Sequence, residues 1–378
     1  MDFTLSREQA LVQKMIRSFT ENEVKPIAAE IDRNHTYPAE NIEKLFKLGV
    51  MGMVVPKEYG GQGADQLSAA IVAEELAKAC ASTSDIVAGH TLCCVPILEH
   101  GTEAQKAKYL PMLTSGGVLG GMGITEPNAG SDASKSQTEA KLEGDHYVIN
   151  GSKIFITNGP EAGVFVIFAM TDKSKGTKGL SAFIIESSFP GFSIGKIEEK
   201  MGLHGVHTSE LVFQDMIVPK ENLLGQEGKG FKICMQTLDT GRIGIAAQAL
   251  GIAEGAMAEA VTYTKSRAQF GKPISKFQNT QFTFADMYTR IESSRLLTYQ
   301  AATAKQNGKK CTVEAAMAKL TASETAMWVT TKVVQMFGGY GYTMDYPVER
   351  MMRDAKITEI YEGTSEVQRI VISANMGL

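Results

Sequence analysis

A glutamate near the C-terminus is the first candidate for chemistry. Glu362 lies in the stretch I-Y-E-G-T-S, residues 360–365, and the glycine after it lets a ligand or another backbone approach closely. Ser365 and Gln368 fit the S-x-x-Q capping box of a helix start. The spacing therefore predicts a carboxylate just ahead of a helix N-terminus, whose free N–H groups attract carbonyl or anionic ligands. The alternative is a surface glutamate in a helix-capping loop.

Other polar segments could contribute to a site, although each also has a purely structural interpretation. The loop 123–132 (G-I-T-E-P-N-A-G-S-D) offers hydroxyls and backbone donors, which can line a polar heterocycle or a phosphate. In the stretch 153–159 (K-I-F-I-T-N-G), alternation puts Phe155 and Thr157 on one face of a strand. Asp239 and Arg242 lie one helical turn apart, which a structural ion pair explains equally well.

The composition is that of an ordinary globular protein. With 378 residues, 43% hydrophobic and 21% charged, two or three domains are expected. A net charge of −4 gives no indication of nucleic-acid binding. We expect no membrane span and no signal peptide. The five cysteines form no C-x-x-C pair, which predicts neither disulfides nor a metal site and favours a reducing cytoplasm.

The elements that must position these residues follow the order helical, β, helical. Apolar periodicity predicts helices over 5–16, with Ser6 as N-cap, and around 42–48 and 67–80. Short β-branched runs at 146–149, 153–157, 164–170, 180–185 and 210–213 predict an antiparallel sheet or small barrel, and Asn150-Gly151 predicts a hairpin between the first two.

Helical periodicity returns in the last third of the chain. It covers 244–261 and continues in two apolar stripes. The first stripe consists of Phe284, Met287 and Ile291, and the second of Val313, Met317, Leu320, Met327 and Val334. The helix that carries the second stripe is predicted to end at Gly338. We therefore predict a mainly α protein with a central β domain. The boundaries are a helical domain over 1–120, a middle antiparallel β-barrel or sandwich over 121–230, and a C-terminal helical bundle over 231–378.

Taken in this order, the motifs resemble those of the acyl-CoA dehydrogenase family. The resemblance covers essentially the whole chain and rests jointly on G-I-T-E-P-N-A-G-S-D, K-I-F-I-T-N-G, D-T-G-R, R-x-Q-F-G-K-P, Q-M-F-G-G-Y-G-Y and I-Y-E-G-T-S-E-V-Q-R. The branch that the chain resembles is the short-chain, butyryl-CoA dehydrogenase-like bacterial one. The resemblance implies an N-terminal α domain, a middle β domain and a C-terminal four-helix bundle.

The resemblance also implies an FAD site and a catalytic base. Glu362 matches the catalytic glutamate, whereas one branch carries its base at the position of Gly241, where glycine cannot serve. Residues matching FAD contacts are Met122, Ile124, Thr125, Phe155, Ile156, Thr157, Arg267, Gln269, Phe270, Phe277, Gln278, Gln335, Met336, Phe337, Gly338, Gly339, Thr364, Ser365 and Glu366. Residues matching acyl-CoA contacts are Ser131, Asp239, Arg242, Tyr361 and Gly363. Phe155 and Glu366 depart from the pattern, since relatives often carry Trp and Gln there.

The implied activity is α,β-dehydrogenation of a short-chain acyl-CoA, or the reverse reduction of a 2-enoyl-CoA. Electrons would be exchanged with an electron-transferring flavoprotein, by a homotetramer that shares FAD contacts between subunits. Cys93 and Cys94, in the segment that resembles the floor of the acyl pocket, are expected to be small core residues. If they open space, bulkier aryl-acryloyl groups would fit.

Two alternatives belong to other classes. The first is an acyl-CoA oxidase or flavin monooxygenase on the same fold. The second is a non-catalytic, DNA-protecting member of the superfamily, which the net charge of −4 and the intact Glu362 argue against.

Overall fold

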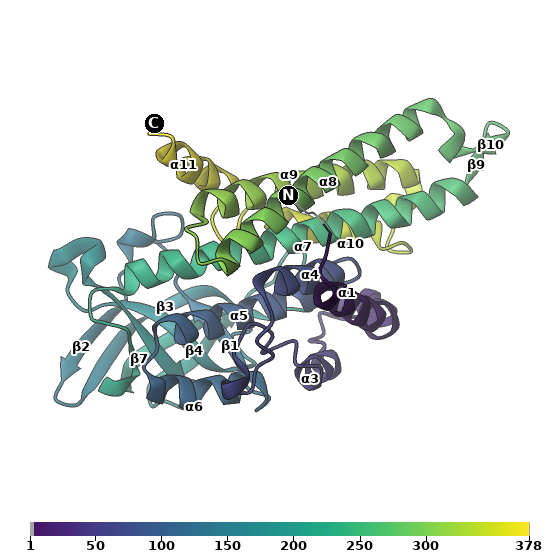
Figure 1. Ribbon diagram of the computed structural model, residues 1–378. Helices are drawn as coiled ribbons and strands as arrows, with labels where there is room; N and C mark the ends of the chain where they lie inside the picture. The colour runs from purple at the N-terminus through teal and green to yellow at the C-terminus, as the bar shows by residue number, and fades with distance from the viewer. Residues whose placement is uncertain (1–3, 378) are drawn as a thin grey trace.

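A computed structural model of the protein describes residues 4–377. Its N-terminal part is helical, as predicted, with α1 (Arg7–Phe19), α2 (Ala28–Asn34), α3 (Ala39–Lys47), α4 (Gln66–Ala77), α5 (Ala81–His100) and α6 (Glu103–Thr114) (Figure 1). The predicted N-cap is confirmed, because the Ser6 hydroxyl accepts the Gln9 N–H at 3.2 Å and the Gln9 side chain accepts the Ser6 N–H at 2.9 Å.

The middle part is one eight-stranded sheet. Its strands are β1 (Leu119–Gly123), β2 (Glu139–Glu143), β3 (His146–Thr157), β4 (Ala162–Met170), β5 (Leu180–Glu186), β6 (Phe192–Ile197), β7 (Thr208–Pro219) and β8 (Leu223–Leu224). The order is β6-β7-β3-β2-β4-β5-β8, with β1 paired to β4. Neighbours are antiparallel, as predicted, except that β1 and β2 each pair with β4 in parallel.

The hairpin predicted at Asn150-Gly151 is wrong. Strand β3 runs straight through these residues, and the turn lies before it, at Gly144, whose φ is 66°. The register with β7 shifts between Ile149 and Gly151, which is a β-bulge. A Cβ on Gly151 would lie 2.8 Å from the Thr138 Cα, so close backbone approach explains this glycine.

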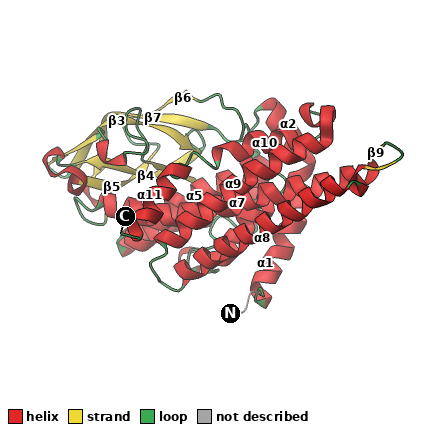
Figure 2. Ribbon diagram, turned by 90° about the horizontal axis from the view of Figure 1, so that it is seen from above, coloured by secondary structure: helices red, strands yellow, loops and turns green. Residues whose placement is uncertain are grey.

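The C-terminal part is again helical. It contains α7 (Gly230–Ser266), the small hairpin β9 (Ala268–Gln269) and β10 (Lys272–Pro273), α8 (Gln278–Gln306), α9 (Thr312–Phe337), α10 (Val348–Ile357) and α11 (Ser365–Asn375). Helix α7 runs from the sheet to the β9–β10 hairpin at the far end of the molecule (Figures 1 and 2). The stripe predicted on α9 is only partly buried. The buried face carries small residues such as Ala315, Ala318, Ala322 and Ala326, which allow α9 to pack closely on α7.

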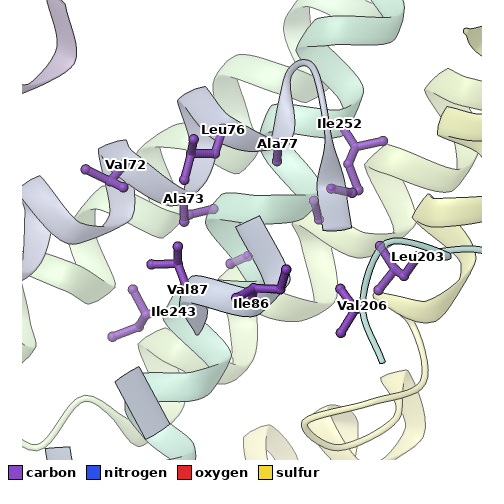
Figure 3. Close-up of a cluster of buried hydrophobic side chains, with 14 of the residues drawn as sticks. Val72, Ala73, Leu76, Ala77, Ile86, Val87, Leu203, Val206, Ile243 and Ile252 are labelled. Carbon is purple, nitrogen blue, oxygen red and sulfur yellow. The ribbon is translucent and has the colours of Figure 1, made fainter. Parts of the chain in front are cut away.

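One core joins the helical and β parts. Side chains from α4, α5 and α7 meet Leu203 and Val206 of the loop before β7 (Figure 3). Burying each large apolar side chain of this kind stabilises the fold by about 1.5–3 kcal/mol. The core therefore fixes α5 and α7 against each other.

Helix α5 is long and apolar enough to cross a membrane by length and composition, which the sequence analysis did not anticipate. However, 83% of the most apolar 18-residue stretch of this helix is buried inside the protein, as in the core helix of a globular protein.

Candidate active site

A cavity of about 510 Å³ lies where α4, α5 and α7 meet the ends of β1 and β3 and the segment 357–364. Much of its wall consists of small or apolar residues such as Ala73, Ala88 and Leu92. The sequence-predicted residues that line it are Met122, Ile124, Thr125, Ser131, Phe155, Ile156, Thr157, Tyr361, Glu362, Gly363 and Thr364. Segments far apart in the sequence thus converge on one concave, mostly apolar site, as ligand sites do.

Glu362 presents a carboxylate oxygen to this cavity. Its φ of 52° and the φ of 89° at Gly363 are both left-handed, a conformation uncommon for a non-glycine residue. Its Oε2 atom is buried and has no hydrogen-bond partner among the described residues. An unsatisfied buried carboxylate on a strained backbone is typical of functional sites, so the surface-glutamate alternative does not fit.

The surroundings of Glu362 adjust its acidity. Burial raises the pKa of Glu362 to about 7, although the positive charges of Arg242 and Lys319 oppose the increase; the Asp85 carboxylate adds to it. A carboxylate whose pKa lies near neutrality is well matched to remove a proton at physiological pH.

Helix α7 approaches the Glu362 carboxylate at Gly241. A Cβ on Gly241 would lie 2.5 Å from Glu362 Oε2 and 3.1 Å from Leu92 Cδ2. The space beside the carboxylate therefore exists because residue 241 has no side chain.

We predict that Gly241→Ala lowers the rate of the chemical step without unfolding the protein. The added methyl group meets the flexible end of Glu362, which can move at little cost in stability, but a displacement of ~1 Å can cost about 10²-fold in rate. Stopped-flow kinetics and thermal melting measure the two effects. Gly244 lines the same cavity, and a Cβ there meets no atom within 4 Å, so Gly244→Ala is the control for a methyl group added to the cavity without contact to Glu362. Equal rates for the two variants would contradict this prediction.

Two polar residues that were not predicted, Asp85 and Gln248, hold the side chain of Tyr361 and so anchor the loop on its N-terminal side. The Tyr361 hydroxyl donates to Asp85 Oδ1 at 3.0 Å and also contacts Gln248 Oε1. The Gln248 amide in turn donates to the Ala81 carbonyl at 3.0 Å. Burial raises the pKa of Asp85 to about 6. The signal available in the sequence was a polar residue inside an apolar helical run, which Asp85 and Gln248 both are.

The predicted capping box at Ser365 and Gln368 is wrong by one residue. Thr364 is the N-cap of α11, and its hydroxyl accepts the Val367 N–H at 3.3 Å. Gln368 instead donates to the Glu362 carbonyl at 3.1 Å and to the Gly363 carbonyl at 2.8 Å. Its side chain therefore holds the Glu362–Gly363 turn and does not cap the helix. Ser365 is buried and Glu366 is exposed, and neither lines the cavity.

A buried ion pair joins the two segments predicted to lie beside the flavin. Lys153, on β3, is fully buried, and its Nζ lies 2.6 Å from Glu126 Oε1 in the 123–132 loop. Burial alone would raise the pKa of Glu126, but Lys153, Ser136 and the Gln137 N–H lower it to about 2. No role was predicted for either residue, although both lie within motifs that carry the family resemblance.

Asp239 and Arg242 form the structural ion pair that the spacing allowed. Arg242 Nη1 lies 2.8 Å from Asp239 Oδ1, and the Thr312 hydroxyl donates to Asp239 Oδ2 at 2.7 Å. Neither residue lines the cavity. The Nε atom of Arg242 is buried without a partner among the described residues.

The remaining predicted flavin residues lie elsewhere. A second cleft of about 500 Å³ is lined by Arg267, Gln269 and the run 335–339, at the hairpin end of α7. Phe270, at the hairpin tip, is 93% exposed, whereas Phe277 and Gln278 lie outside both cavities. Within one chain, the structure therefore places most of the predicted flavin residues in two separate groups, one at each cavity.

The chain belongs to the acyl-CoA dehydrogenase family. Sequence profiles of the family's N-terminal, middle and C-terminal domains match residues 6–117, 121–216 and 228–377. The chain is 63% identical to a short-chain specific acyl-CoA dehydrogenase of Clostridium acetobutylicum, with 100% of both chains covered. It is 52% identical to an acryloyl-CoA reductase (NADH) of Anaerotignum propionicum, covering 99% of this chain and 95% of the relative.

Solved structures agree in fold. Butyryl-CoA dehydrogenase from Megasphaera elsdenii matches with a TM-score of 0.98 at 54% identity, over 100% of both chains. A structure described as the electron transferring flavoprotein of Acidaminococcus fermentans matches with a TM-score of 0.98 at 55% identity, over 100% of this chain and 99% of the other. The FAD complex of PigA matches with a TM-score of 0.96 at 31% identity, over 100% of both.

Proposed function

We propose that this protein is an FAD-dependent dehydrogenase of short-chain acyl-CoA thioesters. The observation that carries the proposal is Glu362, which lines a largely apolar cavity: its buried Oε2 atom has no hydrogen-bond partner among the described residues, and its pKa is raised to about 7. Membership of the family, and 63% identity to a short-chain specific member, support the reaction class.

The residues of the cavity fit a flat, mostly apolar ring system beside Glu362. Phe155, Ile156 and Thr157 line the cavity from the end of β3, and Met122 and Thr125 line it from β1 and the loop after it. Phe155 has a φ of 59° and is 59% exposed, so an aromatic face remains available to a ligand. FAD, when bound there, would supply the acceptor for the hydride from the substrate β-carbon.

The protein's own part in the reaction is proton removal. Glu362 Oε2 would take the α-proton of the thioester, whose acidity depends on stabilising the enolate oxygen. No hydrogen bond within residues 4–377 uses the backbone N–H of Glu362, so this group is free to donate to the thioester carbonyl. The apolar walls exclude water and thereby strengthen both interactions.

We also propose electron exchange with an electron-transferring flavoprotein and assembly with further copies of the chain, as a homotetramer. The second cleft supports the assembly: Gly241 and Arg267 lie roughly 40 Å apart along α7, at 1.5 Å per residue. One cofactor cannot reach both groups of predicted flavin residues within a chain, so Arg267 and Gln335 would serve the cofactor of a neighbouring subunit. The free, buried thiols of all five cysteines fit a reducing cytoplasm.

We predict that butyryl-CoA gives the highest kcat/KM in a series of acyl-CoAs from propionyl to octanoyl. The small residues around Cys94 leave room in the cavity, but relatives that are 63% and 55% identical to this chain are named as short-chain specific. Anaerobic bleaching of the flavin measures each substrate. A higher value for octanoyl-CoA would contradict the short-chain assignment.

The reverse reaction is the second candidate function, because an acryloyl-CoA reductase is 52% identical to this chain. Reoxidation of the reduced flavin by 2-enoyl-CoAs, including aryl-acryloyl-CoAs, tests it. Fast reoxidation by air in the same assay would instead favour an oxidase.

A further inference from the structure

We propose that Lys319 is a positioning residue for the catalytic base: from behind the cavity, its ammonium group holds the Glu362–Gly363 turn and supplies a positive charge to the carboxylate. This inference rests on the proposed role of Glu362 as the base.

The geometry places Lys319 directly behind the loop. Lys319 lies in the N-terminal third of α9, is fully buried and does not line the cavity. Its Nζ donates to the Gly363 carbonyl at 2.7 Å. Because Glu362 and Gly363 both have left-handed backbones, a donor that fixes the Gly363 carbonyl also fixes the direction of the Glu362 carboxylate and N–H.

The hydrogen bond alone does not explain a lysine here. The Gly363 carbonyl already accepts the buried Gln368 amide at 2.8 Å, so a neutral donor satisfies it. Burying an ammonium group is costly unless its charge is compensated. What Lys319 adds, and Gln368 does not, is therefore a positive charge next to Glu362.

The other charged groups near Glu362 are already engaged. Arg242, on α7, is ion-paired with Asp239, and Asp85, on α5, accepts the Tyr361 hydroxyl and repels the carboxylate. Cys234 is buried and Tyr361 is half-buried, and both have pKa values above the usual range, so they stay neutral. The single hydrogen bond of Lys319 among the described residues goes to a carbonyl, which leaves its charge uncompensated except by Glu362 and, more weakly, Glu359 and Glu366.

The direction of the effect follows from this charge. Burial lowers the pKa of Lys319 to about 8, and Glu362 opposes this decrease, so at neutral pH Lys319 is charged and favours the ionised form of Glu362. Removing the charge raises the pKa of Glu362. The base is then protonated at a pH where the wild type is active, and activity recovers only at higher pH. A shift of one pH unit corresponds to about tenfold in rate on the acid side.

The test compares Lys319→Gln with Gln368→Leu in the FAD-loaded enzyme. Lys319→Gln keeps a donor for the Gly363 carbonyl but removes the charge, whereas Gln368→Leu removes donors from the same loop and no charge. The first readout is exchange of the α-protons of butyryl-CoA with D2O as a function of pH. The second is an infrared titration of the Glu362 carboxyl group, assigned by its loss in Glu362→Gln, which needs no turnover.

In Lys319→Gln, we expect the midpoint of the exchange pH profile and the midpoint of the infrared titration both to move to higher pH by about one unit. In Gln368→Leu, we expect both midpoints to stay in place while the exchange rate falls at all pH values. Unchanged midpoints in Lys319→Gln, or an equal shift in Gln368→Leu, would overturn the inference. If Lys319→Gln does not fold, Lys319→Met at the same position must show the same shift. A wild type that exchanges no α-proton, yet shows the infrared shift between variants, would refute the proposed function and leave the role of Lys319 intact.

Discussion

Glu362→Gln is expected to lower the rate of flavin reduction by butyryl-CoA by at least ~10²–10⁴-fold. The amide has nearly the shape of the carboxylate, so FAD and acyl-CoA should still bind. It cannot accept the α-proton, and Gly241, the residue beside it, offers no substitute. Anaerobic stopped-flow absorbance measures the reduction, and equilibrium titration measures binding.

Asp239→Asn is the matched control for this variant. Asp239 is an acid two residues before Gly241 on α7, but it is paired with Arg242 and does not line the cavity. We therefore expect Asp239→Asn to reduce flavin much faster than Glu362→Gln. If Glu362→Gln reduces its flavin at close to the wild-type rate, the base lies elsewhere and the proposed mechanism is wrong.

Lys153→Met is expected to cost about 3–5 kcal/mol in the free energy of unfolding, because it leaves the buried Glu126 carboxylate without its counter-charge. The same change should weaken FAD binding, since the pair holds the 123–132 loop against β3. Chemical denaturation monitored by circular dichroism gives the stability, and flavin retention on dialysis gives the affinity.

The exposed pair of Lys47 and Glu43 provides the comparison. Both side chains are largely in solvent, so Lys47→Met should change stability little. The double variant Glu126→Gln/Lys153→Met should recover part of the loss, because it removes both buried charges. A Lys153→Met protein as stable as the Lys47→Met protein would show that the buried pair has no structural role.

The order of the parts could be predicted from local patterns. Periodic apolar residues and the Ser6 cap are local signals, and they predicted α1, α3 and α4, whereas they did not predict α2, α5 and α6. The hairpin prediction at Asn150-Gly151 failed because the dipeptide that makes a tight turn also permits a β-bulge. The close approach of Thr138, which local sequence does not show, decides between the two. The buried face of α9 was predicted wrongly for a related reason: close packing on α7 favours alanine over larger apolar residues on that face.

The candidate site was predictable only where a motif contains it. Glu362 and the residues around Thr157 line one cavity, as the motifs implied. The partners that hold the loop, Asp85, Gln248 and Lys319, come from three separate helices, and no sequence spacing relates them to Glu362. Their roles depend on tertiary contacts, which the sequence alone does not display.

The most direct test of the central claim is a single anaerobic turnover. Butyryl-CoA is added to the FAD-loaded protein without any other electron acceptor, and the flavin spectrum and the thioester product are recorded together. The account predicts that the flavin absorbance bleaches and that but-2-enoyl-CoA forms, with the substrate losing one hydrogen from each of its α- and β-carbons. A flavin that stays oxidised while butyryl-CoA remains unchanged would contradict it.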